Sequence, residues 1–355
     1  MIKPANNNLR GMFLDADDVR VITIDLPLIT KRLVGKKRVY GELALIGDFH
    51  YGHEEFSHSV LNGYLNYFKA HPYIQFGLMG DYVNYAETSW HVRDETMTID
   101  KQIEQFCGDW RPFKNRIKFM LSGNHDERFI RVTKSYRFLR NLALEMGINP
   151  DKCSIGEPQR GFFLVVKAGE KLYGGYVHHG STNARINRKL QLKRMGSNNQ
   201  VCFIAHGHTH ELSWGEKRTF RSLEIINGEV KNVVRRQFLI STGCFLKYPS
   251  YAEAKSYPYT DVGCPILRFY ADESEMEIYD LTSHYKQFLS KGGISFQGIK
   301  KPLSTELKKI LPKKTKCPNC GSIASQKRGI EVNKTGKRQR YQCLKCGKWF
   351  SVQME

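Results

Sequence analysis

Potential metal ligands follow five apolar segments within the first 210 residues, each beside a glycine. The segments lead into G-D-F-H, G-D-Y-V-N, S-G-N-H-D, H-H-G and H-G-H-T-H, which contain Asp48, His50, Asp81, Asn84, Asn124, His125, Asp126, His178, His179, His206, His208 and His210. One Asp at a strand end is more often a turn or a helix cap, but capping alone does not account for five such groups. Sites in layered α/β folds gather outside the carboxyl ends of strands, so these groups are predicted to meet in one site.

The types of ligand indicate the chemistry. Imidazole and carboxylate ligands without thiolates favour manganese, iron or zinc over calcium, and manganese is our first expectation. The ligands suffice for two ions, and one carboxylate can bridge ions about 3.5–4 Å apart. A site of this kind holds the attacking and leaving oxygens of a displacement at phosphorus and lowers the pKa of a bound water.

The elements that must position these ligands alternate between strand and helix in the early part of the chain. Strand character is predicted for 43–46, 73–79, 117–121, 172–177, 201–205, 237–240, 266–270 and 276–279. Apolar residues at helical spacing predict helices over 56–68, 99–106 and 138–146. The sequence therefore predicts an α/β or α+β layered domain.

The five groups resemble, in order, the motifs of the calcineurin-like metallophosphoesterase superfamily over about 48–210. The resemblance implies an αββα sandwich with a two-metal site at its rim and a phosphoester hydrolase activity. It implies one ion held by Asp48, His50, Asp81 and His210, and a second held by Asp81, Asn124, His179 and His208.

The resemblance also separates ligands from catalytic residues. It places His125 beside the scissile phosphate, where an imidazole can stabilise charge or protonate the leaving oxygen. Asp126 is expected to orient His125, as carboxylates near metal sites commonly do. His179 is preferred to His178 as the ligand because the family histidine directly precedes glycine.

Four of the nine cysteines are clustered near the C-terminus as two C-x2-C pairs separated by 22 residues. Cys317, Cys320, Cys343 and Cys346 have the pattern of a four-thiolate structural zinc site. The alternative is a pair of disulfides, which the odd cysteine total and the absence of a secretory signal disfavour. The segment resembles the zinc ribbons of transposases and transcription proteins.

Positive charge is concentrated in the same region. The chain carries a net charge of +20, and residues 300–355 contain 15 Lys or Arg against 3 Asp or Glu, a net +12. In the ribbon, cations interleave with aromatic residues, which suits nucleic acid, although a ribbon that docks a protein is an alternative. The predicted nucleic-acid contacts are Arg185, Arg188 and Lys189 near the metals and Lys337, Arg338, Arg340, Tyr341 and Trp349 in the ribbon.

The composition shifts suggest three parts: a catalytic domain over 1–287, a basic linker over 288–314 and a zinc ribbon over 315–355. No apolar run approaches the length of a membrane span, and the N-terminus lacks the apolar core of a secretory signal. The sequence therefore predicts a cytoplasmic or nucleoid-associated protein without a membrane partner. A phage or mobile-element source would fit the pairing of an enzyme with a ribbon.

Together these features predict a metal-dependent phosphodiesterase, a nuclease that acts on DNA in preference to RNA. One alternative is a phosphomonoesterase, or a protein or nucleotide phosphatase, with the ribbon as a docking module. Another is a non-catalytic nucleic-acid-binding protein with structural metals. The His125–Asp126 pair argues against that last alternative, because structural metals do not need it.

Overall fold

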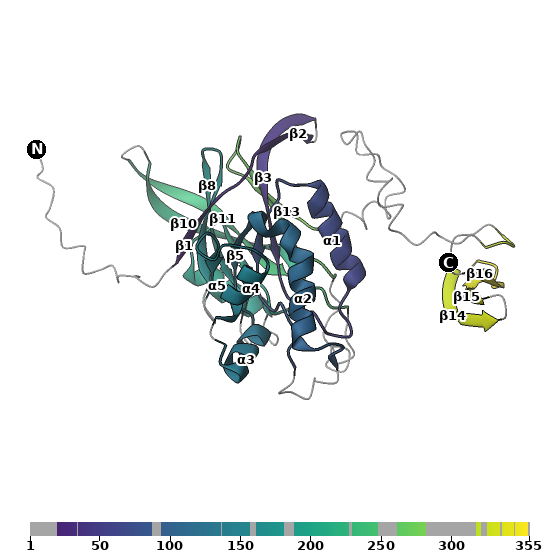
Figure 1. Ribbon diagram of the computed structural model, residues 1–355. Coiled ribbons are helices and arrows are strands. Elements are labelled where there is room, and N and C mark those ends of the chain that lie inside the picture. The colour runs from purple at the N-terminus through teal and green to yellow at the C-terminus, as the bar shows by residue number, and fades with distance from the viewer. Residues whose placement is uncertain are drawn as a thin grey trace, which may run out of the picture. The chain divides into compact units, whose positions relative to one another are not determined.

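The chain divides into two units, Met1–Ser295 and Phe296–Glu355, in a computed structural model (Figure 1). The residues that the structure describes are 20–33, 35–86, 94–135, 137–156, 161–180, 188–226, 229–247, 261–281, 317–320, 325–333, 336–343 and 345–353. The linker predicted for 288–314 lies outside these residues.

The first unit contains a seven-stranded sheet, here called the first sheet. Its order is β13-β12-β3-β4-β5-β6, with β2 paired to β3. The bounds are β2 Ile29–Leu33, β3 Lys36–Ile46, β4 Gln75–Leu78, β5 Ile117–Met120, β6 Ser154–Ile155, β12 Ile266–Tyr270 and β13 Met276–Tyr279. Strands β3, β4, β5 and β6 run parallel, so their carboxyl ends share one edge.

A six-stranded second sheet has the order β1-β7-β8-β9-β11-β10. Its bounds are β1 Val21–Asp25, β7 Phe162–Ala168, β8 Lys171–His178, β9 Phe203–His206, β10 Leu212–Ile226 and β11 Glu229–Thr242. Strands β8, β9 and β11 are parallel, and the fifth predicted ligand group lies between β9 and β10 in the chain.

The sheets pack face to face and helices cover their outer faces, which makes an αββα sandwich. On β3, Leu43 and Leu45 point into the core between the sheets, whereas Ala44 and Ile46 point to the helical side, as expected from the alternation of side chains along a strand. The helices are α1 His58–Ala70, α2 Ile99–Trp110, the 3-10 helix Arg111–Arg116, α3 Asn124–Thr133, α4 Phe138–Glu145 and α5 Arg188–Asn198. Leu192 of α5 packs against β9 and β11 on the second sheet.

The αββα class predicted from the sequence is thus the fold observed. Each predicted strand overlaps an observed strand, and β12 and β13 have the predicted bounds. The sequence missed β1, β2, β6, β7, α3 and most of the β10–β11 hairpin. Strand β2, for example, consists mainly of exposed residues, two of them charged. It therefore carries no apolar pattern that would predict a strand.

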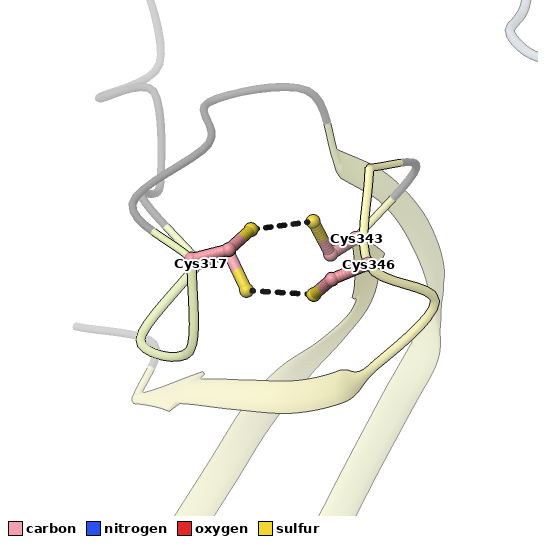
Figure 2. Close-up of side chains that lie close together, drawn as sticks. Cys317, Cys343 and Cys346 are labelled. Atoms are coloured by element: carbon pink, nitrogen blue, oxygen red, sulfur yellow. Dashed lines mark hydrogen bonds between the residues drawn. The ribbon is translucent and has the colours of Figure 1, made fainter.

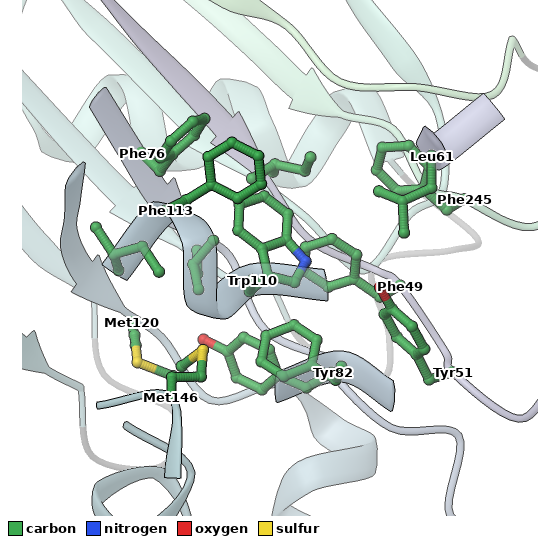
Figure 3. Packing of buried hydrophobic residues seen from close by; sticks show 14 of the residues in the cluster. Phe49, Tyr51, Leu61, Phe76, Tyr82, Trp110, Phe113, Met120, Met146 and Phe245 are labelled. Atoms are coloured by element: carbon green, nitrogen blue, oxygen red, sulfur yellow. The ribbon is translucent and has the colours of Figure 1, made fainter. Parts of the chain in front are cut away.

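An aromatic cluster supports the first ligand group (Figure 3). Phe49, between Asp48 and His50, is fully buried, and its ring lies within 6.2 Å of the rings of Tyr51, Tyr82, Phe106, Trp110 and Phe245. Aromatic side chains bury large areas and prefer such edge and offset contacts. The cluster therefore fixes the backbone that carries two predicted ligands.

The second unit contains a three-stranded antiparallel sheet in the order β14-β15-β16. Its strands are β14 Ser325–Asn333, β15 Gly336–Cys343 and β16 Trp349–Gln353.

Candidate metal centre

The loops after β3, β4, β8 and β9 and the first turn of α3 bring the predicted ligands together. Their donor atoms form two clusters, in each of which the atoms lie within 4.8 Å of one another. Asp48, His50, Asp81 and His210 make the first cluster, and Asp81, His179 and His208 make the second. Asp81 therefore belongs to both, as a bridging carboxylate must.

In the first cluster, nitrogen atoms and carboxylate oxygens converge on one point. The Nε2 atoms of His50 and His210 are 3.0 Å apart. His50 Nε2 lies 3.6 Å from Asp81 Oδ2, and His210 Nε2 lies 3.4 Å from Asp48 Oδ1. Two imidazole nitrogens and two carboxylates at these separations form a cradle for a divalent cation.

In the second cluster, the amide oxygen of Asn124 joins the histidines. Asn124 Oδ1 is 2.5 Å from His208 Nδ1 and 3.3 Å from His179 Nε2. His179 Nε2 is also 3.3 Å from Asp81 Oδ2. His179 Nδ1 contacts the carbonyl oxygen of Met79 at 2.7 Å, a contact that turns Nε2 toward a metal.

Buried polar atoms and electrostatics at these clusters fit a divalent cation. Asp81 Oδ2 and His50 Nδ1 are buried without a hydrogen-bond partner in the described part of the chain. Burial disfavours the charged form of His179, but the facing Asp81 carboxylate raises its pKa to about 10. Burial would raise the pKa of Asp81, yet His179, His125 and His50 hold it well below the usual range. A buried carboxylate that stays ionised among imidazoles is a donor set for a divalent cation, whose binding would displace the proton of His179.

The backbone at the ligands is strained. Seven described residues other than glycine have a positive φ, and five of them are predicted ligands: Asp48, His50, Asp81, His208 and His210, at 49° to 63°. The left-handed region costs such residues of order 1–3 kcal/mol each, and strain of this kind clusters at functional sites. The loops therefore adopt a backbone conformation that lowers the stability of the fold but directs these side chains toward the metal clusters.

His125 lies beside the first cluster, with its ring 4.5 Å from that of His50. Its backbone N–H donates to Asp81 Oδ1 at 2.8 Å. The ring is oriented differently from the expectation: Nδ1 contacts the backbone carbonyl of Asn84. Orientation of His125 by Asp126 was therefore the wrong assignment.

Asp126 supports Asp81 instead. Its carboxylate accepts hydrogen bonds from the backbone N–H groups of Asp81, Tyr82 and Gly123, at 2.8, 3.1 and 2.8 Å. Burial and the nearby Asp81 charge raise the pKa of Asp126 well above its usual range. The residue holds together the loops after β4 and β5, so its part in the site is to position the bridging ligand.

Gln102 of α2 is a positioning residue that the sequence did not reveal. It is fully buried, and its Oε1 accepts a hydrogen bond from Asn84 N at 2.8 Å. Its Nε2 donates to Met97 O at 3.1 Å. Gln102 thereby anchors the peptide segment whose carbonyl contacts His125. A glutamine among the polar residues of an amphipathic helix carries no signal of this role.

His178 is not part of either cluster. Its Nδ1 accepts the N–H of Gly180 at 2.8 Å, and the side chain is half-buried. It therefore shapes the turn that precedes the next loop.

Gly123 leaves room for Asp81, which gives a testable prediction. A Cβ at Gly123 would lie 2.1 Å from Asp81 Oδ1 and 2.3 Å from Asp81 N. Gly123→Ala must therefore displace the shared carboxylate. We expect manganese affinity, measured by calorimetry, to fall by about 10–100-fold, as when groups that orient ligands are lost. Gly108→Ala on α2 is the control, because a Cβ added at Gly108 would have no atom within 4 Å. Unchanged affinity in Gly123→Ala would contradict the close contact.

The four clustered cysteines form a separate candidate site in the second unit (Figure 2). Cys317 Sγ is 3.7 Å from Cys346 Sγ, and Cys320 Sγ is 3.5 Å from Cys343 Sγ. These separations exclude disulfides. Four sulfurs at about 2.3 Å from a central zinc would be about 3.8 Å apart. A backbone hydrogen bond from Lys348 and the neighbouring thiols lower the pKa of Cys346 to about 6, which favours the thiolate that zinc binds.

The predicted nucleic-acid contacts divide between the faces of the C-terminal sheet. Arg340 pairs with Ser351 in register, and its guanidinium lies 5.0 Å from the ring centroid of Trp349, which is 52% exposed. Tyr341 pairs with Phe350 and stacks on it at 5.5 Å. Alternate residues of a strand face opposite ways, so Arg338 and Arg340 share a face that excludes Tyr341. Arg185 and the side chains of Arg188, Lys189 and Lys337 lie outside the described part of the structure.

None of the helices in the described ranges is long and apolar enough to cross a membrane.

No protein-family model matches the sequence, and no curated protein matches it in sequence. Solved structures resemble it weakly. Vacuolar protein sorting 29 from Cryptosporidium parvum is 16% identical over 68% of this chain and 98% of its own, with a TM-score of 0.32. A conserved protein from Streptococcus pneumoniae, described as a predicted phosphoesterase, is 14% identical over 68% and 88%, with a TM-score of 0.30. The phosphoesterase Yfce from E. coli is 11% identical over 67% and 98%, with a TM-score of 0.31. At this level of similarity, the activity has to be inferred from the site residues themselves.

Proposed function

We propose that the chain is a metal-dependent phosphodiesterase that cleaves nucleic acid, with DNA as the preferred polymer. The observation that carries this is Asp81, a buried carboxylate shared by two ligand clusters with His125 beside them. Bound ions at such a site would activate a water and neutralise charge on the phosphate oxygens. Manganese is the first candidate, with zinc or iron next.

The residues around the clusters suit an attack at phosphorus. With Nδ1 tied to the Asn84 carbonyl, Nε2 of His125 is the ring nitrogen that can reach a leaving oxygen and supply its proton. Asn124 and His125 are the first residues of α3, and the N-terminus of a helix favours an anion. A phosphate placed against the clusters would therefore meet both His125 and the positive end of α3.

The C-terminal unit supports a polymeric substrate over a small ester. The exposed Trp349 ring next to Arg340 places a stacking surface beside a cation. Proteins that bind single-stranded nucleic acid combine these two kinds of group. The charge of the last 56 residues, net +12, adds attraction to phosphates. The unit is thus proposed to be a zinc ribbon that holds the nucleic acid.

The test uses the purified full chain with Mn²⁺ on DNA, RNA and bis-p-nitrophenyl phosphate. We expect cleavage of DNA, loss of cleavage in His125→Ala by about 10²–10⁴-fold, and full activity in His58→Ala, which alters an exposed histidine on α1. Arg340→Ala with Trp349→Ala should weaken polymer binding and leave hydrolysis of the small diester unchanged. Hydrolysis of monoesters or nucleotides alone, without cleavage of any polymer, would favour the phosphatase alternative and sink the nuclease proposal.

A further inference from the structure

The β2–β3 hairpin is strongly basic and lies at the end of the sandwich opposite the metal centre. Residues 29–38 contain Lys31, Arg32, Lys36, Lys37 and Arg38 and no acidic residue. Strand β3 ends at the metal edge, since Asp48 follows it closely, so the hairpin turn before Lys36 lies at the far end (Figure 1).

The strand register places like charges directly opposite one another in this hairpin. Lys31 faces Arg38, and Arg32 faces Lys37. Like charges in opposed positions destabilise a strand pair. The pairing is therefore unfavourable for the folded protein by itself.

Among the residues that the structure describes, acidic or hydroxyl partners compensate only one of the two opposed pairs. Arg38 forms ion pairs with Asp272 at 2.8 Å and Glu273 at 3.3 Å. Lys31 Nζ donates to the Tyr73 hydroxyl at 3.1 Å. On the other face, Arg32 and Lys37 are exposed, and neither forms an ion pair with any described residue. Among the described residues, Arg32 donates to the carbonyl of Gly35 at 3.1 Å.

A second basic hairpin projects from the same end of the sandwich. Strand β9 pairs with β11 at Phe238–Ser241 only, so the outer part of the β10–β11 hairpin continues as a two-stranded ribbon among the described strands. Arg221 faces Val234, and Thr219 faces Arg236. All four are exposed, and Val234 is 60% exposed. One face of this ribbon therefore presents two cations around an uncovered apolar side chain.

The spacing suits a polymer that runs along the sandwich. Lys37 precedes Ile46 by nine residues on β3, which is about 30 Å at about 3.3 Å per residue. Phosphates recur about every 3.4 Å along each DNA strand. About nine nucleotides would thus separate the scissile bond from the β2–β3 cations.

We infer that the β2–β3 hairpin is a phosphate-binding arm for double-stranded DNA, assisted by the outer β10–β11 ribbon. The inference rests on the proposed function and adds the substrate form and a second contact region to it. Arg32 and Lys37 would neutralise phosphates of a duplex that extends from the metal centre, and a ribbon of two strands fits the major groove. The repulsion between these cations is relieved when DNA binds.

The test is Arg32→Gln with Lys37→Gln in the full chain, with Lys69→Gln and Lys101→Gln as a control of equal charge on α1 and α2. The dissociation constant for a 25-base-pair duplex is measured from 0.05 to 0.3 M salt. The slope of log affinity against log salt should fall by about two in the hairpin variant, about one per lost phosphate contact. The control variant should keep the slope, and both should hydrolyse bis-p-nitrophenyl phosphate like the wild type.

Thermal unfolding distinguishes this role from a structural one. Removal of the opposed charges should leave the melting temperature unchanged or raise it, whereas a structural role would lower it. Duplexes that extend fewer than about nine base pairs from the cut should be cleaved equally by variant and wild type.

Three results would overturn the arm. The first is a wild type that binds and cuts duplex DNA together with a hairpin variant that has the same salt slope and the same rate of cleavage. That result would leave the proposed function intact. The second is a loss of affinity for single-stranded DNA of every length that equals the loss for the duplex, which would exclude recognition of the duplex form. The third is binding of phosphatidylserine vesicles, instead of DNA, through these two residues. A wild type that neither binds nor cuts any polymer would defeat the proposed function as well.

Discussion

Asp81→Asn is expected to empty both metal clusters at once and to reduce hydrolysis by about a thousandfold. The substitution keeps the shape and the oxygen that accepts the N–H of His125, but it removes the charge that two clusters share. The low pKa of Asp81 means that the full negative charge is lost at neutral pH. A thousandfold loss corresponds to about 4 kcal/mol of transition-state stabilisation, which is within what metal ions supply. Calorimetry with Mn²⁺ and the rate on bis-p-nitrophenyl phosphate measure the two effects.

Asp48→Asn is the matched comparison, because Asp48 belongs to the first cluster only. We expect this variant to keep one ion per chain, whereas Asp81→Asn keeps neither at micromolar metal. Asp100→Asn, at an exposed position on α2, should bind two ions like the wild type. Two tightly bound ions in Asp81→Asn would show that the carboxylate does not bridge.

Removal of the zinc proposed for the C-terminal unit is expected to unfold β14–β16 and to leave the αββα unit folded. Two of the four thiols are almost fully buried, Cys317 at 2% and Cys343 at 1% exposure, and the only stacked aromatic pair in the described part of this unit is Tyr341 with Phe350. A sheet this small has little apolar core, so binding of the metal supplies most of its folding free energy, about 10 kcal/mol or more in comparable peptides. Limited proteolysis of the full chain with excess chelator should cut within 317–353 and spare the first unit.

Cys343→Ser should reproduce the effect of the chelator, and Cys202→Ser, at a half-buried cysteine outside the cluster, should not. One zinc per chain by elemental analysis, absent from Cys343→Ser, would accompany the change. Release of the sheet by a reductant alone, without a chelator, would instead indicate disulfides.

Helices and strands could be predicted from the sequence mainly where one or both of their faces are buried, because burial requires apolar residues at regular spacing. The continuous apolar segment Leu43–Ile46 follows from burial of both faces of β3 in two different cores, and the apolar stripe on α1 follows from burial of one helix face. The β10–β11 hairpin was recognised only at 237–240, where it enters the sandwich. Before Gln237, Lys231, Asn232, Arg235 and Arg236 of β11 are polar and exposed, so no apolar period marks a strand there.

The metal ligands were predictable for a related reason. Coordination chemistry demands particular residue types, and those types stand at strand ends beside glycines, where Asp48, Asp81 and His179 were all recognised from the sequence. The resemblance also placed Asp81 in both ligand sets. The tertiary structure brings donors as far apart in the chain as Asp48 and His210 to within 3.4 Å of one another.

The sequence by itself determined the ligand types, the four-cysteine pattern and the uneven distribution of charge, since each depends on residue identity alone. Only the tertiary structure decided that Asp126 supports Asp81, that a backbone carbonyl of Asn84 orients His125, and that Arg32 stands opposite Lys37. Contacts to backbone groups and the register of paired strands depend on geometry, and any residue can supply a carbonyl. That is the physical reason why such contacts leave no trace in the order of the amino acids.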